Sequence, residues 1–258
     1  MQSRLIDVAG GRAQIRVYEA GKGPPLVFLH GAGLIPGDPT ISTLAEKFHV
    51  YAPLLPGFED SEGGELRDML DFVLHTFDVI DALGLDKPII VGHSMGGMIA
   101  AEMAAVAPHQ VPKLGLICPA GLWLDEHPIP DLFAMLPYEF PPMLFHDVKL
   151  GEELMTKGVD LDDIGFLEGF MINASRSLGT AGKILFPIPD RGLKDRMYRI
   201  RAKTVIVWGA EDRLTVPAYG DAFKTGIKGS TLVVIKDAGH EVNIEKPQAV
   251  LAALSELI

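Results

Sequence analysis

Cysteine and basic residues are scarce in this 258-residue chain, and no long apolar run is present. The single cysteine, Cys118, excludes an internal disulfide and fits a reducing compartment. The 23 Lys and Arg residues against 34 Asp and Glu leave a net charge of −11, which disfavours nucleic acid and anionic membranes as partners. No apolar stretch approaches the length of a membrane span, and the N-terminal MQSRLIDVAGG lacks the apolar core of a signal peptide. These absences predict a cytoplasmic protein; whether it is a monomer or a homodimer stays open.

Ligand motifs are equally scarce. The sequence contains no Cys/His cluster, no HExxH motif and no phosphate-binding loop. We therefore expect neither a metal nor a cofactor.

Short apolar runs alternate with helical patterns over most of the chain. Apolar residues make up 48% of the composition, enough for a large core. Buried strands are expected at 25–31, 49–57, 88–92, 113–118, 204–209 and 231–235, and a half-buried strand at 13–20. Helices are expected near 66–83, 95–107, 216–226 and 247–257. This alternation predicts an α/β fold with a mostly parallel sheet covered on both faces.

The alternation stops between residues 121 and 195. This section shows no clear strand, mixes prolines with large apolar residues, and includes a helical pattern at 161–178. It contains 13 acidic residues against 6 basic ones. We interpret 121–195 as a helical cap inserted into a core domain formed by 1–120 and 196–258.

A glycine-rich pentapeptide follows the apolar run at 88–92. Residues 89–98 read IIVGHSMGGM and contain the pattern G-x-S-x-G from Gly92 to Gly96, with Ser94 at its centre. A strand, this pentapeptide and then a helix are the context of a nucleophile elbow, in which the serine lies on a tight strand-to-helix turn. The positive end of the following helix would stabilise the negative charge that develops during acyl transfer. The alternative is a glycine-rich turn whose serine only caps the helix.

A nucleophilic serine needs a base, and the base needs a carboxylate. His240 follows the apolar run 231–235, and Asp212 follows the run 204–209. Both would lie at the carboxyl ends of parallel strands, where α/β sheets carry their sites. Glu211 and Asp237 are alternatives for the carboxylate, but Asp237 is too close in sequence to His240 to orient it easily.

The other seven histidines fit the role of base less well. His93 precedes the serine and should point elsewhere, and His30 is expected to form structural hydrogen bonds. His49, His75 and His109 are expected at the surface or at helix ends. His127 and His146 belong to the cap and are expected to face solvent, with the lining of a pocket as the alternative.

Backbone N–H groups near the serine complete the predicted site. The segment LHGAG (29–33) ends a buried strand in a glycine turn that can direct an amide toward a developing oxyanion. We predict Ala32 as one donor, with Gly33 as second choice. The other donor would be Met95, the residue after the nucleophile.

These segments together resemble the α/β-hydrolase superfamily. The matching stretches are HGAG (30–33), LLPGFEDS (54–61), GHSMGG (92–97), GAEDRLTVP (209–217) and GHEVNIEKP (239–247). The resemblance implies an eight-stranded, mostly parallel sheet with a helical cap inserted after the sixth strand. It covers nearly the whole chain, and the order Ser94, Asp212, His240 is the one that this fold uses.

Within the superfamily, the chain resembles compact bacterial carboxylesterases and, less closely, hydrolases of meta-cleavage products. The latter split a carbon–carbon bond and usually show HGxGPG and an Asn before the serine, whereas this chain has HGAGLI and His93. The predicted function is therefore hydrolysis of short- to medium-chain or aryl esters, with carbon–carbon bond hydrolysis or lactone hydrolysis as alternatives. A non-catalytic ligand receptor of the same fold is the alternative from another class.

Large apolar residues of the cap are candidates for binding the substrate. They are Trp123, Phe133, Leu136, Phe140 and Phe145. The competing interpretation for each is that it attaches the cap to the core. A small-molecule ester is the expected partner.

Overall fold

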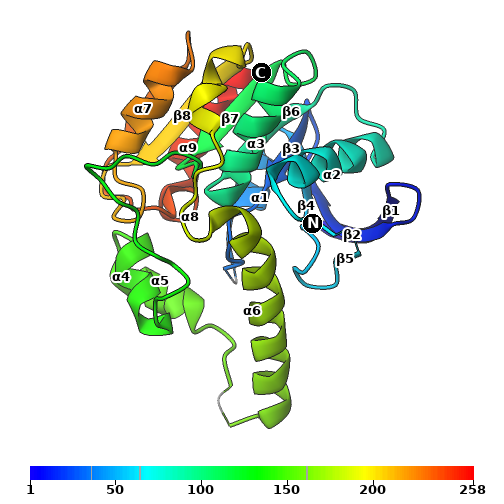
Figure 1. Cartoon of the computed structure of the whole chain (residues 1–258). Coiled ribbons are helices and arrows are strands. Elements are labelled where there is room, and N and C mark those ends of the chain that lie inside the picture. The colour runs from blue at the N-terminus through cyan, green and yellow to red at the C-terminus, as the bar shows by residue number, and fades with distance from the viewer. Residues whose placement is uncertain (36, 64, 161) are drawn as a thin grey trace.

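The computed structural model describes residues 1–35, 37–63, 65–160 and 162–258, and centres on one twisted sheet (Figure 1). Eight strands follow one another in the order β1-β2-β4-β3-β6-β7-β8-β9, and the two-residue β5 pairs with β2. The strands are β1 Gln2–Val8, β2 Ala13–Ala20, β3 Pro25–Leu29, β4 His49–Pro53, β5 Glu62–Gly63, β6 Ile89–His93, β7 Lys113–Ile117, β8 Lys203–Gly209 and β9 Thr231–Ile235. Pairs that involve β2 are antiparallel, and all others are parallel. The predicted eight-stranded, mostly parallel α/β sheet is confirmed.

Helices cover both faces of this sheet. α2 (Met69–Ala82), α3 (Met95–Val106) and α7 (Ala218–Gly226) lie on one face, and α1 (Thr40–Leu44) and α9 (Pro247–Leu254) lie on the other (Figure 1). The short α8 (Val242–Glu245) precedes α9, and the 3-10 turn η4 (Ser255–Leu257) follows it. Asp68 caps α2 by accepting hydrogen bonds from the Leu70 and Asp71 amides, which explains why the helix begins later than its apolar pattern.

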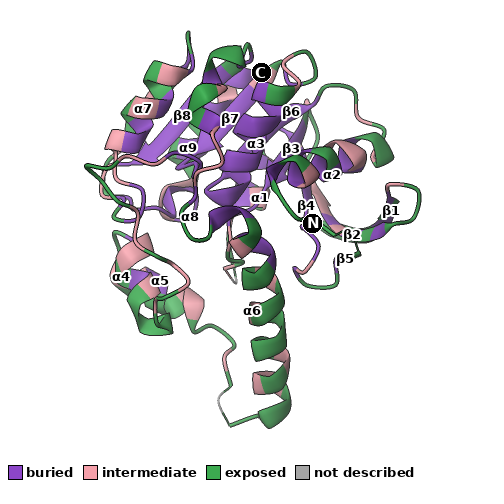
Figure 2. Cartoon of the chain, in the orientation of Figure 1, coloured by how far each residue is buried: buried purple, intermediate pink, exposed green. Residues whose placement is uncertain are grey.

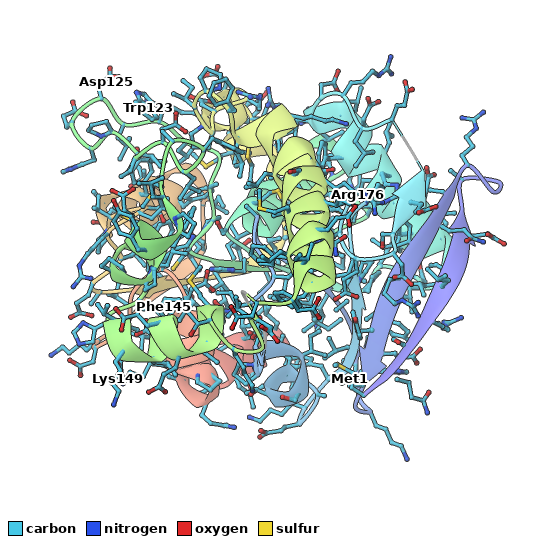
Figure 3. All side chains as sticks on the ribbon, turned by 90° about the horizontal axis from the view of Figure 1, so that it is seen from below. Met1, Trp123, Asp125, Phe145, Lys149 and Arg176 are labelled. Atoms are coloured by element: carbon cyan, nitrogen blue, oxygen red, sulfur yellow. The ribbon has the colours of Figure 1, made fainter. Side chains whose placement is uncertain are left out.

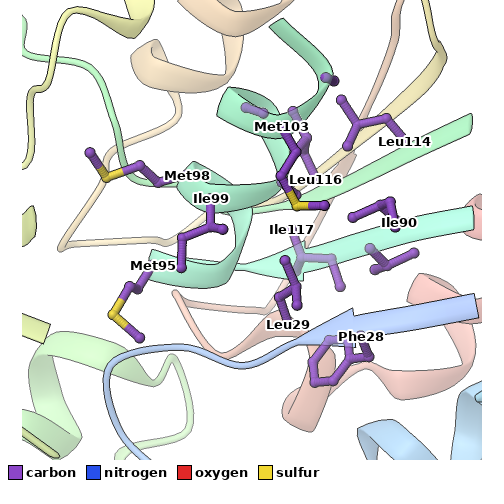
Figure 4. Packing of buried hydrophobic residues seen from close by; sticks show 14 of the residues in the cluster. Phe28, Leu29, Ile90, Met95, Met98, Ile99, Met103, Leu114, Leu116 and Ile117 are labelled. Carbon is purple, nitrogen blue, oxygen red and sulfur yellow. The ribbon is translucent and has the colours of Figure 1, made fainter. Parts of the chain in front are cut away.

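The core lies where α3 crosses the central strands. Met95, Met98, Ile99 and Met103 of α3 pack against apolar residues of β3, β6 and β7 (Figure 4). α3 is buried around almost its whole circumference. Its many glycine and alanine residues let it lie close to the sheet. This packing holds the first residue of α3 rigidly above β6.

The segment between β7 and β8 carries no strand longer than an isolated bridge in its described part. It contains α4 (Phe140–Leu144), α5 (Val148–Met155) and α6 (Ile164–Leu185), and the 3-10 turns η1 (Pro137–Glu139), η2 (Leu193–Asp195) and η3 (Met197–Arg199). In chain order β7 is the sixth of the eight strands, so the insertion lies where it was predicted. The division into a core domain and a cap, with boundaries at 121 and 195, stays a prediction.

Most of α6 projects away from the core (Figure 2). Only its last residues, among them Ala181 and Leu185, are buried, whereas Ile164 at its start is 81% exposed. None of the described helices, the 22-residue α6 included, is both long and apolar enough to cross a membrane. The helical pattern predicted at 161–178 is thus part of a longer helix; Leu161 lies outside the described residues.

The turn between β6 and α3 requires glycine at two positions. A Cβ on Gly92 would collide with the carbonyl group of Gly96, and a Cβ on Gly96 would collide with the carbonyl groups of Leu29 and His30. Between them Ser94 adopts φ 52° and ψ −114°, a conformation that L-residues rarely occupy. The glycines therefore let the chain reverse within a few residues and hold Ser94 at the end of the sheet.

This geometry predicts that Gly96→Ala destabilises the fold by roughly 1–3 kcal/mol, the cost of overpacking a rigid interior. Gly169→Ala is the matched control, because it also adds one methyl group to a helix but meets no atom within 4 Å. We expect the control to be neutral or slightly stabilising, since alanine favours helices over glycine. Urea denaturation of both variants measures the difference. Equal stability of the two variants would contradict the close approach described for Gly96.

Candidate active site

Four neighbouring strands deliver one functional group each to the same edge of the sheet. Ser94 follows β6, Cys118 follows β7, Asp212 lies three residues after β8, and His240 lies in the turn after β9. Since β6, β7, β8 and β9 are parallel neighbours, their carboxyl ends lie side by side. The three residues singled out from the sequence are thereby brought together.

A chain of hydrogen bonds joins these three side chains. His240 Nε2 lies 2.9 Å from Ser94 Oγ, and His240 Nδ1 lies 2.8 Å from Asp212 Oδ2. The carboxylate can only accept, so Nδ1 carries the proton and Nε2 is left to accept the serine proton. Ser94 is 8% exposed and the other two side chains are more deeply buried, so water screens these contacts little.

Asp212 is held by hydrogen bonds on both carboxylate oxygens. Oδ1 accepts from the amides of Leu214 and Thr215, each at 2.9 Å. Oδ2 accepts from the Thr215 hydroxyl at 2.9 Å in addition to His240. Thr215 was not identified from the sequence, although its position in the segment GAEDRLTVP is a signal that could have found it.

The two alternative carboxylates are placed elsewhere. Glu211 Oε2 accepts a hydrogen bond from the Ala238 amide at 3.0 Å, so it supports the turn before His240. Asp237 is exposed and has a φ of 53°. Asp212 is therefore the carboxylate that reaches the imidazole.

Burial and charge act in opposite directions on His240. Burial alone lowers the pKa of its imidazole, but the charge of Asp212, the hydrogen bond that the imidazole donates to Asp212 and, when Glu241 is ionised, the charge of Glu241 together outweigh burial. The pKa of His240 is consequently raised above its ordinary value of 6.5. A raised pKa means a stronger base, as proton removal from a serine requires.

Cys118 lies closer to this site than the sequence indicates. It is buried, as expected, but its Sγ, an Asp212 carboxylate oxygen and a His240 ring nitrogen all lie within 4.8 Å of one another. Such a donor set could in principle hold a metal ion. His240 Nδ1 is, however, already hydrogen-bonded to Asp212, and burial raises the pKa of the Cys118 thiol well above its ordinary value. The residues present thus favour a neutral thiol beside a hydrogen-bonded acid–base pair.

The predicted amide donors lie directly after Ser94, at the start of α3, and in the loop that follows β3. Met95 is the first residue of α3, so its N–H has no partner within the helix. Among the described residues, neither the Met95 nor the Ala32 amide donates to a protein acceptor. Ala32 is half-buried and Gly33 is exposed, and the role of either amide as oxyanion donor stays a prediction.

His30 fixes the loop that carries Ala32. Its Nδ1–H donates to the Gly31 carbonyl at 2.7 Å, and its Nε2 accepts from the Leu55 amide at 3.1 Å. Burial lowers the pKa of His30 to about 4, so it stays neutral and keeps this tautomer. The expectation that His30 is a structural hydrogen-bonding residue agrees with these contacts.

The inserted segment is bound directly above the His240 turn. The Glu241 amide donates to the Leu144 carbonyl at 3.0 Å, and Arg213 Nη1 donates to the Pro142 carbonyl at 2.6 Å. The Asp147 amide donates to Glu245 at 2.8 Å. These bonds attach α4 and α5 to the loops that carry Asp212 and His240.

The five apolar candidates for substrate binding occupy different environments. Phe145 is 1% exposed and packs on Gly151 of α5, and Leu136 is 51% exposed. Phe133 meets Phe186 edge-on, while Trp123 donates through Nε1 to Asp125 at 3.1 Å. Phe140 begins α4 and is half-buried. In Figure 3 Phe145 lies on the α4–α5 side and Arg176 on α6. A role in substrate binding stays a prediction for each of the five.

Among the remaining histidines, one expectation is wrong. His75 lies on the inner side of α2 and is buried, because α2 presents this position to the sheet. His49 is half-buried and bonded to Glu19 at 2.7 Å, whereas His109, His127 and His146 are exposed. His93 is buried beside His240.

Comparison with known proteins agrees with this architecture. The model of the alpha/beta hydrolase family matches residues 26–254. The chain belongs to the alpha/beta hydrolase family. It is 27% identical over 258 residues to 2-hydroxy-6-oxo-6-phenylhexa-2,4-dienoate hydrolase of Comamonas testosteroni, covering 90% of this chain and 86% of that one.

Solved structures of this fold include enzymes that are named for different activities. A meta-cleavage product hydrolase from Pseudomonas fluorescens superposes with a TM-score of 0.77 at 21% identity, over 98% of this chain and 96% of that one. Naproxen esterase from Bacillus subtilis superposes with a TM-score of 0.72 at 20% identity, over 99% of this chain and 90% of that one. Because these sequence identities are only 20% and 21%, the structural similarities show the fold alone.

The site geometry predicts how the buried histidines titrate. We expect His240 to lose its proton with a midpoint above 6.5, and His93 to stay neutral from pH 5 to 8, because burial lowers the pKa of His93 to about 3. Asp212→Asn should lower the His240 midpoint, since the imidazolium then loses its anionic partner. NMR titration of the histidine rings in both proteins tests this. A His240 midpoint unchanged in Asp212→Asn would refute the coupling.

Proposed function

We propose that this protein is a serine hydrolase that cleaves carboxylic esters through an acyl-enzyme intermediate, with Ser94 as nucleophile. The observation that carries the proposal is the continuous hydrogen-bonded chain from Asp212 through His240 to Ser94. It is supported by the helix that begins at Met95 and by the backbone amides of Met95 and Ala32, which donate to no backbone acceptor among the described residues. These are the parts that acyl transfer needs: a nucleophile, its base, an orienting carboxylate and donors for an oxyanion.

The acylation step follows from the proton positions. His240 Nε2 takes the Ser94 proton while Oγ forms a bond to the ester carbonyl carbon. The carbonyl oxygen becomes an oxyanion that accepts hydrogen bonds from the amides of Ala32 and Met95. Asp212 stabilises the imidazolium formed on His240. The carbon–oxygen bond to the alcohol then breaks, and the alcohol leaves with the proton from His240.

Deacylation repeats these steps with water. His240 removes a proton from a water molecule, which attacks the acyl carbon, and the proton then returns to Ser94 Oγ as the carboxylic acid leaves. Besides the substrate and this water molecule, the proton transfers use the side chains of His240 and Ser94. The neutral form of His240 starts both steps, so activity should fall as the pH drops through its raised pKa.

We further propose that residues 121–195 act as a cap that shapes the acyl and alcohol subsites. The hydrogen bonds from Glu241 and Arg213 to the backbone before α5 hold this segment over the catalytic loops. The segment also carries most of the net negative charge of the chain, which favours neutral over anionic substrates within about 8–10 Å. Neutral short- to medium-chain or aryl esters are the substrates that fit this charge.

A second candidate is hydrolysis of a carbon–carbon bond in a dienoate. It is favoured by two relatives, from Comamonas testosteroni and Burkholderia cepacia, that align with 90% and 92% of this chain. Both are named as hydrolases of such a dienoate. The same groups would serve it, because the carbonyl carbon to be attacked again becomes an acyl group. Against it stand the negative cap and the presence of His93 and HGAGLI where those enzymes usually have Asn and HGxGPG.

The ester proposal predicts turnover of p-nitrophenyl acetate, butyrate and octanoate that depends on Ser94. Ser94→Ala should reduce kcat/KM by more than about 1,000-fold, since the nucleophile is lost. Ser3→Ala, on the edge strand β1 far from the site, is the control and should retain full activity. Mass spectrometry of a quenched reaction should find the acyl group on the peptide containing Ser94. Equal turnover by wild type and Ser94→Ala would reject the proposal.

The second candidate is tested with 2-hydroxy-6-oxo-6-phenylhexa-2,4-dienoate, whose loss is followed by its absorbance. The ester proposal expects kcat/KM for the best p-nitrophenyl ester to exceed that for the dienoate. The reverse order, again dependent on Ser94, would assign the chain to carbon–carbon hydrolysis. Binding without turnover of either class would favour the receptor alternative.

A further inference from the structure

His93 is a buried side chain of the site that the proposed mechanism does not use. It is the last residue of β6, directly before Ser94, and is 4% exposed. Its ring centroid lies 5.2 Å from that of His240. The ring therefore lies beside the proposed base, although its own nitrogens do not contact Ser94 in the described hydrogen bonds.

A hydrogen bond links His93 to the main chain of the base. His93 Nε2 lies 3.0 Å from the carbonyl oxygen of His240. A carbonyl oxygen only accepts, so Nε2 carries the proton and donates it. His240 is thus tied to the nucleophile turn twice, through its ring to Ser94 and through its backbone to His93.

The opposite side of the same ring meets the loop that carries Ala32. A Cβ added to Gly31 would lie 3.1 Å from His93 Nδ1 and 3.6 Å from Ser94 Cβ. The absence of a side chain at Gly31 therefore leaves room for the imidazole. Three loops, which carry the nucleophile, the base and a proposed oxyanion donor, meet at this one ring.

The ring contributes no positive charge to the site. The groups that face it are His240, Asp212, His30 and Glu241. Burial, followed by the nearby His240, lowers the pKa of His93 to about 3, and burial raises the pKa of Glu241 to about 8. The 3.9 Å approach of His93 Nε2 to Glu241 is accordingly not an ion pair, because the imidazole of His93 is neutral. A cation at His93 would oppose the imidazolium that forms on His240 during acylation.

We propose that His93 is a positioning residue that holds the imidazole of His240 between Ser94 and Asp212 by donating its Nε2–H to the His240 carbonyl. This inference rests on the proposed function for its effect on rate, but its effect on the geometry of His240 is independent of any substrate. Without the hydrogen bond, the turn at 239–241 gains freedom and the His240–Asp212 contact becomes less well defined. A displacement of about 1 Å at such a base can reduce the rate by about 100-fold.

The test compares three variants. His93→Leu removes the donor, and His93→Gln restores an amide N–H near the position of Nε2. His75→Leu is the matched control, because His75 is also buried but lies on α2, away from the site. For each protein, NMR titration gives the pKa of His240, and p-nitrophenyl butyrate hydrolysis gives kcat and KM separately.

We expect His93→Leu to lower kcat by about 10- to 100-fold with little change in KM, and to shift the His240 pKa downward as its contact with Asp212 weakens. His93→Gln should recover most of both values. His75→Leu should leave the His240 titration and kcat as in the wild type. A purely structural role for His93 would not produce this pattern.

Three results would overturn the proposal. One is a folded His93→Leu variant with wild-type His240 titration. Another is a His93→Gln variant no closer to the wild type than His93→Leu. The third applies if His93→Leu does not fold: the pKa of His240 in folded His93→Gln then differs from that in the wild type. Lack of hydrolysis by the wild type would instead reject the proposed function, and the titrations would still decide the role of His93.

Discussion

The backbone of Ser94 is the feature on which the rest of the site depends. With φ 52° and ψ −114°, this residue reverses the chain between β6 and α3. The strain is tolerated because apolar residues of α3 are packed into the centre of the core and because Gly92 and Gly96 let the two arms of the turn approach. The result is a hydroxyl held at the N-terminal end of a helix, where a developing negative charge is stabilised.

Sheet order supplies the remaining geometry. β6, β7, β8 and β9 are neighbours, so groups separated by more than 100 residues in the chain lie within hydrogen-bond distance at one edge. Asp212 is buried there, yet both of its oxygens accept hydrogen bonds, which offsets the loss of hydration. Because both side chains are buried, the attraction between Asp212 and His240 is screened little and helps to overcome the effect of burial on the pKa of the imidazole.

The two parts of the inserted segment are attached to the core in different ways. Its α4–α5 part is attached to the loops of Asp212 and His240, whereas most of α6 projects from the core. Ser177 and Thr180, near the buried end of α6, donate hydrogen bonds to the carbonyls of Gly57 and Pro56 and so fix this part of α6 to the core. Esters and dienoates would require the same groups on the sheet, so substrate preference would be set by this segment.

The sequence alone determined the fold class and the residues that meet at the candidate site. Apolar runs that end in glycine or in a short polar loop identify buried parallel strands, and Ser94, Asp212 and His240 follow three of them. β1 was missed because it is an edge strand in which only Ile6 and Val8 are buried, which leaves almost no pattern. Only tertiary structure decided that His75 is buried, that Phe145 packs on α5, and that His93 faces the His240 carbonyl. Local spacing reveals the period of an element and the chemistry of its turns, whereas the direction of a side chain and its partners depend on contacts between segments far apart in the chain.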